Sequence, residues 1–406
     1  MKILWVNTNF LHPTTKGGQI RTLEMLRWLS QWHEIHYVAL EDPRSPEGPR
    51  RAGEYSSRAY PFRYTAPAKP SPAFYAELAR GLFSAIPVAV SRFCPPGMRA
   101  FLADLIHKER FDRAVVDHLA PTSYFPDLEH SLFFQHNVET IIWRRNVEHA
   151  ATPLRKLYFR LQAARMFEYE RRVSLAAGHI VAVSEEDAAA MRSLFGVTRV
   201  TPISTGVNLE YFAPPRAQAD LPPQPELVFI GSMDWLANID AVTWFVRDVL
   251  PLIRRERPAI RLAVVGRTPS QEILDLAAAD PGILVTGTVP DVRPYLWGAK
   301  ISIVPLRIGG GTRLKIYESM AAGTAVVSTP IGAEGLQVRH PANIRLAETP
   351  GEFARECLDL LDHPEERLRM AAAAREMVAA RCSWEAVARE FEPILDRAPA
   401  LFTSLP

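Results

Sequence analysis

Two basic side chains and one carboxylate follow a run of three glycines in the segment PLRIGGGTRLKIYESMAAG, residues 305–323. The apolar run and glycine turn in this segment predict a helix over 313–322, which begins with Arg313 and Lys315 and carries Glu318. Because the amino-terminal end of a helix is positive, each cation there costs roughly 0.3–1 kcal/mol unless an anion compensates it. The segment therefore predicts a negatively charged ligand.

The same side chains indicate which ligand this is. Glycine lets backbone N–H groups approach a ligand closely, and the helix start, with Thr312 as N-cap and Gly323 as C-cap, attracts phosphate. Arg313 and Lys315 would pair with phosphates, and Glu318 would accept hydrogen bonds from vicinal hydroxyls such as those of a ribose. The combination predicts a nucleoside diphosphate. A strand–turn–helix with solvated charges stays open as the alternative, because the motif is neither a Walker A loop nor a GxGxxG fingerprint.

Composition bounds the class of protein. The chain has 406 residues, of which 48% are hydrophobic and 23% charged, and this length favours two domains. The net charge of +2 argues against a nucleic-acid binder, and three scattered cysteines predict neither a disulfide framework nor a zinc site. No apolar stretch reaches the roughly 18 residues of a membrane span, and the apolar start is too short for a signal peptide. We therefore expect a cytoplasmic protein.

Apolar, β-branched runs alternate with helical patterns along the chain. This alternation predicts an α/β fold in which parallel sheets carry helices on both faces. Since ligands bind at the carboxyl ends of strands in such sheets, Gly231, Ser232 and Gly266, which follow two of the runs, are candidate binding residues. Helices are expected over 18–32, 98–109, 154–177, 238–255 and 313–322. Strands are expected at 2–6, 114–116, 132–135, 179–183, 227–230, 261–265, 283–286, 301–304 and 325–328.

Proline marks the boundary between the halves. The segment 208–226 holds five prolines, a density that stops helices and central strands and so predicts a linker. A second proline-rich segment, 42–73, predicts a surface loop or a lid. We expect two Rossmann-like domains that face each other across a ligand-binding cleft. The expected parts are an N-terminal domain over 1–205, a linker over 206–226, a C-terminal domain over 227–380, and a helix in 381–406 that packs back toward the N-terminal domain.

Segments in both halves carry a family resemblance. One of them resembles the donor-site segment of retaining glycosyltransferases of family 4, which have the GT-B fold: ISIVPLRIGGGTRLKIYESMAAGTAVVSTPIGAEG, 301–335. The resemblance extends in the right order over nearly the whole chain, which makes it far more specific than any single motif. The further matching segments are HPTTKGGQIRTLEML (12–26), FFQHNVET (133–140), PISTGVNLEYFAP (202–214), VFIGSMDWLANIDAVTWF (228–245) and VTGTVPDVRPYLWGAK (285–300).

The resemblance implies roles for the C-terminal half, which would bind a nucleotide sugar. Glu318 aligns with the second glutamate of the family's E-x7-E motif, which binds the ribose, whereas Gly310 stands in place of the first glutamate. Backbone N–H groups of Gly310, Gly311 and Thr312 would then contact the donor sugar. The family's usual Arg and Lys after the first strand of this half are missing from GSMDWLAN, and Arg313 and Lys315 look like their replacements.

The N-terminal half would hold the acceptor side. By resemblance, Gly17 and Gly18 approach the diphosphate and the transferred sugar, and His136 lies near the donor sugar, where it orients a hydroxyl or stabilises the transition state. Each residue has a structural alternative, since His136 could be a hydrogen-bonded histidine at a strand end and the glycines could only shape a turn. Asp291 is interpreted as the charge at the start of a short helix rather than as a contact to the base.

The expected reaction moves a sugar from a UDP- or GDP-sugar to a glycan or lipid-linked acceptor, with retention, in cell-surface or exopolysaccharide synthesis. Cations and N–H groups would stabilise the charge that develops on the leaving diphosphate. The sequence contains no D-x-D tripeptide, so we expect no metal and no other cofactor, with Arg313 and Lys315 in the metal's role. Retention by front-face attack of the acceptor is implied by the resemblance.

Alternatives stay open at this point. A sugar-nucleotide epimerase or hydrolase shares the fold but needs acid/base carboxylates that the sequence does not display, and a non-catalytic nucleotide-sugar-binding protein would bind without turnover. A nicotinamide-dependent dehydrogenase is disfavoured because NTNFLHPTTKGG lacks GxGxxG. The helix over 154–177 mixes Arg and Lys with Phe and Tyr, which indicates a solvated face beside the core. Peripheral attachment of this helix to anionic lipid at the inner face of the membrane is the alternative.

Overall fold

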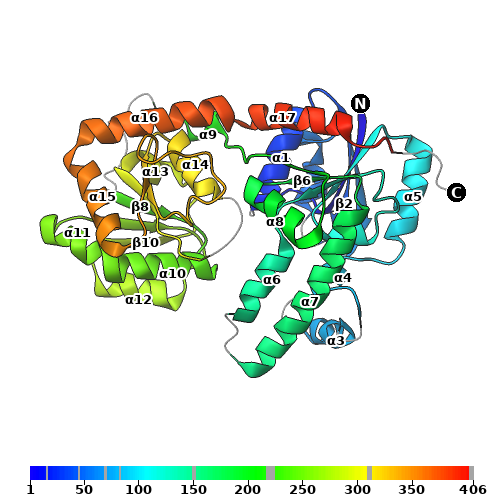
Figure 1. Cartoon of the computed structure of the whole chain (residues 1–406), viewed down its shortest axis with the longest axis horizontal. Helices are drawn as coiled ribbons and strands as arrows, with labels where there is room; N and C mark the ends of the chain where they lie inside the picture. The colour runs from blue at the N-terminus through cyan, green and yellow to red at the C-terminus, as the bar shows by residue number, and fades with distance from the viewer. Residues whose placement is uncertain are drawn as a thin grey trace. The chain divides into compact units, whose positions relative to one another are not determined.

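The computed structural model describes residues 1–14, 17–43, 46–67, 71–81, 84–148, 152–215, 225–308 and 313–401 (Figure 1). The chain divides into two units by its contacts: unit 1 comprises Met1–Ser204 with Val387–Pro406, and unit 2 comprises Thr205–Ala386. This division falls one residue before the domain boundary expected at 205/206. It assigns most of helix α17 (Trp384–Arg397) to unit 1.

Unit 1 is built on a seven-stranded sheet in which every neighbouring pair is parallel. The strand order β3-β2-β1-β4-β5-β6-β7 reverses direction between β1 and β4, so this unit has a topological switch point there. The strands are β1 (Lys2–Asn9), β2 (Glu34–Glu41), β3 (Arg58–Arg63), β4 (Arg113–Asp117), β5 (Leu132–Gln135), β6 (His179–Ala182) and β7 (Val200–Pro202).

Helices connect these strands, and their ends follow local capping rules. Helix α8 (Glu185–Phe195) begins at Ser184, whose hydroxyl accepts from the Asp187 N–H, and ends at Gly196 with φ +72°. The other helices of unit 1 are α1 (Gly17–Leu29), α2 (Glu47–Arg50), α3 (Pro72–Gly81), α4 (Val88–Ser91), α5 (Met98–Glu109), α6 (Glu139–Glu148) and α7 (Pro153–Ala176), with 3₁₀ turns η1 (Ala52–Glu54) and η2 (Ala120–Ser123).

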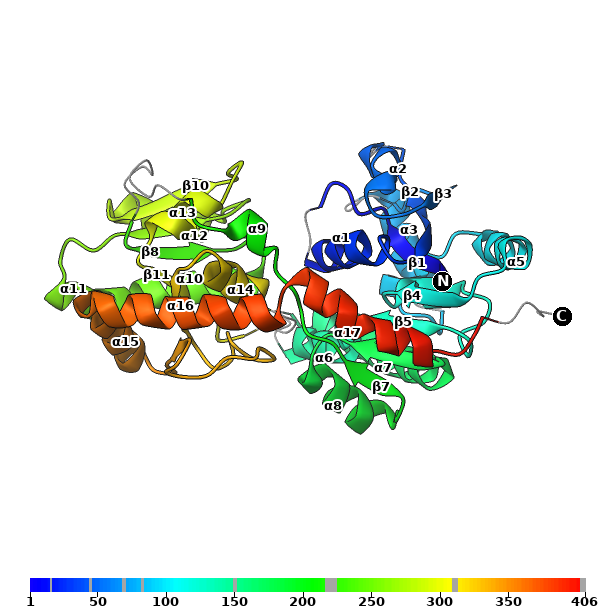
Figure 2. The same ribbon diagram turned by 90° about the horizontal axis from the view of Figure 1, so that it is seen from above.

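Helix α17 lies along unit 1 next to elements from the first half of the chain (Figure 2). The Arg113 guanidinium donates to the Leu395 carbonyl at 2.8 Å, and the Phe391 ring lies 5.9 Å from the Trp5 ring. The end of the chain therefore completes the core of unit 1 rather than that of unit 2.

Unit 2 is built on a six-stranded parallel sheet with the order β10-β9-β8-β11-β12-β13, which reverses between β8 and β11. Its strands are β8 (Leu227–Ile230), β9 (Leu262–Val265), β10 (Ile283–Gly287), β11 (Ile301–Val304), β12 (Ala325–Ser328) and β13 (Arg345–Leu346). Its helices are α9 (Leu209–Phe212), α10 (Leu236–Trp244), the π-helical turn η4 (Phe245–Val249), α11 (Leu250–Glu256), α12 (Gln271–Ala279), α13 (Arg293–Gly298), α14 (Leu314–Ala321), α15 (Pro350–Asp362) and α16 (Pro364–Arg381).

Three sequence-based expectations need correction. The segment 42–73, expected to be a loop or lid, contains α2, η1 and strand β3, whose Pro61 is tolerated because β3 lies at the sheet edge. The helix expected over 238–255 is divided into α10, η4 and α11, because Pro251 cannot donate a backbone hydrogen bond to a continuous helix. The linker expected over 206–226 carries α9, and residues 216–224 of it lie outside the described part. Among the helices that the structure describes, none combines the length and apolarity required to cross a bilayer.

Candidate functional site

Polar side chains gather at the switch point of unit 1. Asp117 is the last residue of β4, His118 follows it, and His136 comes directly after β5. Gly17 and Gly18 open α1 after the loop that follows β1. These residues lie at the carboxyl ends of neighbouring strands, where doubly wound sheets bind their ligands.

Asp117 is the centre of a buried hydrogen-bond network. One carboxylate oxygen, Oδ2, accepts from Trp5 Nε1 at 2.9 Å and from Asn7 Nδ2 and Thr22 Oγ1 at 2.7 Å each. The other oxygen, Oδ1, accepts from His136 Nε2 at 2.7 Å. Burial raises the pKa of this carboxyl, but the two neighbouring histidines and the hydrogen bonds outweigh burial and lower it to about 2. Asp117 is therefore an ionised carboxylate in a fixed orientation.

His136 is buried at this edge of the sheet, and the partly exposed His118 ring stacks on it. Burial lowers the pKa of His136 even though Asp117 favours its charged form, so the ring is a neutral imidazole that donates from Nε2. Its Nδ1 atom is buried and has no hydrogen-bond partner among the described residues. The His118 ring stacks on it with centroids 3.9 Å apart and an angle of 20°, and 35% of the His118 side chain is exposed. Of the two rings, His118 is the one that solvent and ligands reach.

Gly18 brings the start of α1 against both rings. A Cβ atom on Gly18 would lie 3.0 Å from His118 Cε1 and 3.5 Å from His136 Nδ1, so glycine permits the close approach. The structure thus places Gly18 beside His118 and His136. The roles proposed for Gly17 and Gly18 toward a diphosphate stay predictions.

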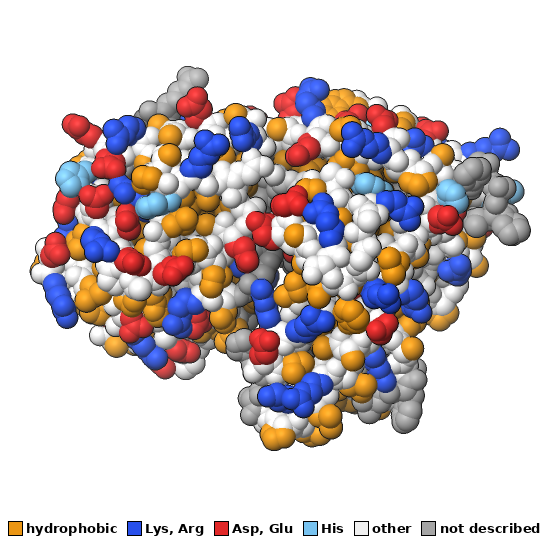
Figure 3. Space-filling view, in the orientation of Figure 1, with side chains coloured by type: hydrophobic (Ala, Val, Ile, Leu, Met, Phe, Trp, Pro, Cys, Tyr) orange, Lys and Arg blue, Asp and Glu red, His pale blue; other side chains and the backbone are white. Residues whose placement is uncertain are grey.

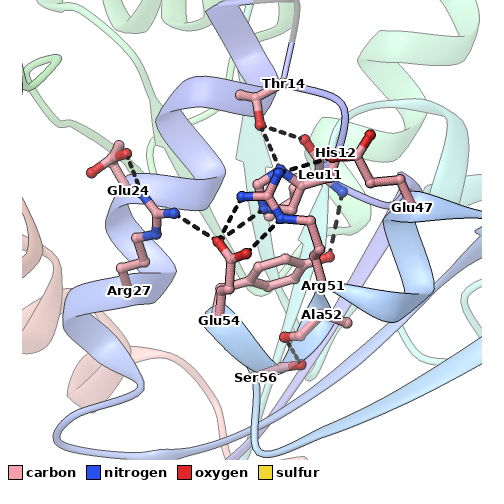
Figure 4. A network of polar contacts seen from close by, with 11 residues as sticks. Leu11, His12, Thr14, Glu24, Arg27, Glu47, Arg51, Ala52, Glu54 and Ser56 are labelled. Atoms are coloured by element: carbon pink, nitrogen blue, oxygen red, sulfur yellow. Dashed lines mark hydrogen bonds and ion pairs between the residues drawn. The ribbon is translucent and has the colours of Figure 1, made fainter.

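A network of charges holds the loop that precedes these glycines (Figure 4). Thr14 Oγ1 donates to the Leu11 carbonyl at 2.8 Å and contacts His12 Nδ1 at 3.2 Å. His12 Nε2 lies 3.2 Å from the Glu54 carboxylate, which also pairs with Arg51 at 2.6 Å. The loop is therefore fixed to the segment between β2 and β3.

The carboxylate and the two histidines of this edge also form a group that could hold a metal ion, because ligand atoms of Asp117, His118 and His136 lie within 4.8 Å of one another. The chemistry of the group does not suit a metal. Both oxygens of Asp117 already accept hydrogen bonds, and parallel stacked imidazoles direct their in-plane lone pairs side by side rather than toward one point. The group fits a hydrogen-bonded carboxylate–histidine pair.

Unit 2 presents a second set of polar residues at its own switch point. Gly231 and Ser232 follow β8, and Gly266 and Arg267 follow β9. A Cβ atom on Gly266 would lie 1.7 Å from the Gly231 carbonyl oxygen, so only glycine allows the two backbones to meet. Ser232 Oγ accepts from Arg267 Nε at 2.8 Å and donates to Asp234 at 2.5 Å. The sequence pattern also places Arg267, with Gly266, directly after a predicted strand.

Lys315 projects from the first turn of α14 beneath this loop. Its ammonium donates to Asn238 Oδ1 at 2.8 Å and lies 4.3 Å from the centre of the Phe229 ring. Asn238 in turn donates to the Ser232 carbonyl at 2.7 Å, and a Cβ atom on Gly231 would lie 2.8 Å from Lys315 Nζ. Burial and, to a smaller extent, the charge of Arg313 lower the pKa of Lys315 to about 7, while Glu318 opposes them. The cation is thus held in an environment that disfavours its charge.

Glu318 and Arg313 complete this set. Burial raises the pKa of Glu318 to about 7, with Lys315 opposing it. Arg313, directly before α14, is buried, and its guanidinium carbon lies 6.0 Å from the centre of the Trp235 ring. Helix α14 ends as expected at Gly323, which has φ +74° and is followed by a bond from Thr324 N–H to the Ser319 carbonyl. The sequence pattern therefore located both the helix and its charged side chains.

The structure can be compared with the predicted site residues one by one. It brings Arg313, Lys315, Gly231, Ser232 and Gly266 to one edge of unit 2, with Glu318 one turn further along α14. Gly310, Gly311 and Thr312 lie outside the described residues. Asp291 accepts from the Arg293 N–H and guanidinium at 2.9 Å, in agreement with its interpretation as a helix-start residue.

His118 and Asp117 were missed. The signal that could have found them is the Asp-His pair directly after the apolar run AVV, because polar residues at the end of a predicted strand had already selected Gly231 and Ser232.

Comparison with known proteins gives a match in the second unit. Residues 224–363 match the family model of group 1 glycosyl transferases. The chain is also 25% identical over 140 residues to an uncharacterized 44.6 kDa protein in the cps region of Klebsiella pneumoniae. That alignment spans 33% of this chain and 36% of the Klebsiella protein, so it leaves most of both proteins uncompared.

Solved structures are similar over nearly the whole chain. A sucrose-phosphate synthase from Thermosynechococcus elongatus aligns with a TM-score of 0.71 and 16% identity over 98% of each chain. Anabaena HepE in complex with UDP and glucose aligns with a TM-score of 0.66 and 11% identity over 98% of this chain and 99% of that one. At these identities the likeness shows the fold. The chain therefore has the α/β GT-B fold, with two parallel-sheet units, and its residues 224–363 match the group 1 glycosyl transferase model.

Proposed function

We propose that this protein is a retaining glycosyltransferase that moves a sugar from a nucleoside-diphosphate sugar to a glycan or lipid-linked acceptor. The observation that carries the proposal is the set of charges at the head of α14, where the buried Arg313 and the half-buried Lys315 adjoin the half-buried Glu318 inside the matched segment. Burial disfavours the charge of Lys315, and a bound diphosphate would give this cation charge-assisted hydrogen bonds.

The donor chemistry follows from these side chains. Arg313 and Lys315 would stabilise the charge that develops on the leaving diphosphate, and Glu318 would accept hydrogen bonds from ribose hydroxyls. HepE was solved with UDP and glucose, which supports a UDP-sugar as the first donor to test. The cps-region relative supports a role in cell-surface or exopolysaccharide synthesis. The cations would take a metal's role, so the reaction would need no metal ion.

Unit 1 would contribute its histidine pair. His118 is the exposed member, so it is the ring that would contact the transferred sugar, and His136 would act as a positioning residue beneath it. Asp117 fixes His136 by accepting its Nε2–H. This assignment refines the expectation that His136 itself touches the donor. Retention by front-face attack rests on the family resemblance.

A panel of UDP- and GDP-sugars tests the proposal, with thermal shift for binding and donor hydrolysis without acceptor for turnover. We expect one donor to raise the melting temperature of the wild type, and Lys315→Ala to abolish the rise while the surface variant Arg247→Ala keeps it. Activity should survive excess EDTA. A panel in which no nucleotide sugar stabilises the protein would contradict the donor site, and an epimerised sugar nucleotide as product would identify an epimerase instead. Loss of activity in EDTA that magnesium or manganese restores would contradict the metal-free mechanism.

A further inference from the structure

The outward face of α7 near its start carries an apolar stripe. Leu154, Leu157 and Leu161 have 78%, 65% and 38% of their surface exposed. Their spacing of three and four residues places them on one side of the helix, about one above the other. Single exposed leucines are common, but three in a row on one helix face form a patch that indicates an interaction.

The opposite face of α7 packs against its own unit, so the stripe is not part of the core. Gln162, Met166 and Val173 are buried there. Near the start of α7 the Phe159 ring lies 6.1 Å from the Trp143 ring of α6, which joins the two helices side by side. The packing of α7 is therefore complete without the leucine stripe.

The segment that carries the stripe is rich in positive charge. Between residues 143 and 166 the sequence has six Lys or Arg residues and one carboxylate, Glu148, in a chain whose net charge is only +2. Figure 3 shows basic and hydrophobic side chains exposed together over the outer end of the α6 and α7 pair. The basic residues are Arg144, Arg145, Arg155, Lys156, Arg160 and Arg165.

We propose that this face of α7 docks on the surface of an anionic phospholipid bilayer. Helices that lie in the membrane interface combine an apolar stripe with flanking Lys and Arg residues. The leucines would enter the acyl boundary, while the long cationic side chains reach the lipid phosphates. A second copy of the chain suits the face less well, because a symmetric contact would bring two cationic surfaces together. The docking surface is independent of the donor site, so it goes beyond the proposed function and does not rest on it.

Vesicle flotation of the full chain tests the proposal, with phosphatidylcholine vesicles that either contain or lack phosphatidylglycerol. We expect the wild type to float only with the anionic vesicles and to be released by salt, because screening weakens the cation–lipid attraction. The combined change Leu154→Ser, Leu157→Ser and Leu161→Ser should weaken binding at least about tenfold. The combined change Arg155→Gln, Lys156→Gln and Arg160→Gln should do the same. Melting curves check that each variant is folded, and the charge variant keeps the test decisive if the serine variant does not fold.

The matched control is Leu368→Ser on α16, where the leucine is 63% exposed and lies in unit 2. We expect this variant to float as the wild type does. The proposal is overturned if the wild type floats with neither vesicle, if the charge variant binds as the wild type does, or if the control loses as much binding as the stripe variants. It is also overturned if the stripe variants only convert a dimer to a monomer in sedimentation, because the face would then be a contact between copies.

Discussion

Each unit places charged side chains where its strand order reverses, but the two sets differ in how their charges are satisfied. In unit 1 the Asp117 carboxylate accepts four hydrogen bonds, and its pKa is lowered to about 2. In unit 2 the pKa of Lys315 falls to about 7 and that of Glu318 rises to about 7, because burial disfavours both charges. One carboxylate is more stable as an ion inside the protein than in water, whereas the two charges of α14 are less stable.

This difference shows in which site the charged groups already have their hydrogen-bond partners before a ligand binds. A buried charge that receives all its hydrogen bonds rigidifies its surroundings, so the network of Asp117 holds the histidine pair in place before any substrate arrives. Buried charges with few partners are costly, and a ligand of opposite charge removes the cost when it binds. Unit 1 therefore supplies a preformed arrangement, and unit 2 supplies a receptor that a nucleoside diphosphate would complete.

Removal of the Asp117 charge should have the largest effect on stability. Asp117→Asn replaces one acceptor oxygen by a donor amide that faces donors, and breaking such a buried network costs about 3–5 kcal/mol. Denaturant unfolding measures the loss. The surface carboxylate Asp104 is 59% exposed, so the control Asp104→Asn should stay within about 0.5 kcal/mol of the wild type.

The same change predicts a dependence on pH. Because the pKa of Asp117 is lower in the folded protein than its usual 3.8, its contribution is present above about pH 4 and is lost as pH falls toward 2. The stability gap between wild type and Asp117→Asn should therefore narrow over this range. A gap that is already absent at pH 7 would show that the network does not hold unit 1 together.

Lys315→Met should separate ligand affinity from stability, with opposite signs. Without ligand, the change removes a buried cation at the positive end of α14, so the melting temperature should stay the same or rise. Affinity for UDP, measured by calorimetry, should fall about 10- to 100-fold, because the lost contact is a charged hydrogen bond to phosphate. Arg313→Ala should lower UDP affinity in the same way. Wild-type UDP affinity in both variants would mean that these cations bind no diphosphate.

Glu318→Gln should reveal a smaller effect that depends on pH. The folded pKa of Glu318 is raised, so the protonated form favours folding below about pH 4.5, and this contribution is lost as pH rises through 7. Glutamine does not titrate, so the variant should melt a few degrees above the wild type at pH 8 and equally at pH 5. Its UDP affinity should nevertheless be weaker, since glutamine offers the ribose hydroxyls one neutral acceptor oxygen in place of two carboxylate oxygens. Equal melting temperatures at both values of pH would contradict the assigned burial of this carboxyl.

Much of the fold could be predicted because central parallel strands are buried on both faces. The strands β8, β11 and β12 read as largely apolar runs, LVFI, ISIV and AVVS, and were located. The strands β2 and β3 were missed, since EIHYVALE includes charged ends and a histidine, and RAYPFR includes a proline at a sheet edge. Strand β3 lies at the sheet edge and buries less surface, so its sequence resembles a loop, whereas β2 is an inner strand whose charged ends and histidine interrupt the apolar pattern.

The two candidate sites also differed in how far the sequence predicted them. Arg313, Lys315 and Glu318 lie within six residues of one another, so a local pattern was enough to find them. The Asp117 network includes Thr22 and Trp5, which are 95 and 112 residues from Asp117 in the sequence. The sequence around Asp117 contains no pattern that predicts these partners. Contacts of this range are determined by strand order, which only the folded chain displays.

The smallest effect is expected for Gly18→Ala, which should move the His118 ring and lower donor turnover without changing the stability of the protein much. In Gly18→Ala the new methyl group would lie 3.0 Å from His118 Cε1, and the partly exposed ring can move away by a few tenths of an ångström. Because alanine is tolerated in a helix, the free energy of unfolding should change by less than about 1 kcal/mol. UDP affinity should fall less than in Lys315→Met, since the charges of α14 are untouched. Donor turnover should fall, however, because the displaced ring would no longer meet the sugar correctly. Gly53→Ala is the matched control, since a Cβ atom there has no neighbour within 4 Å. Equal turnover in the two variants would remove His118 from the reaction and leave the histidine pair a purely structural part of unit 1.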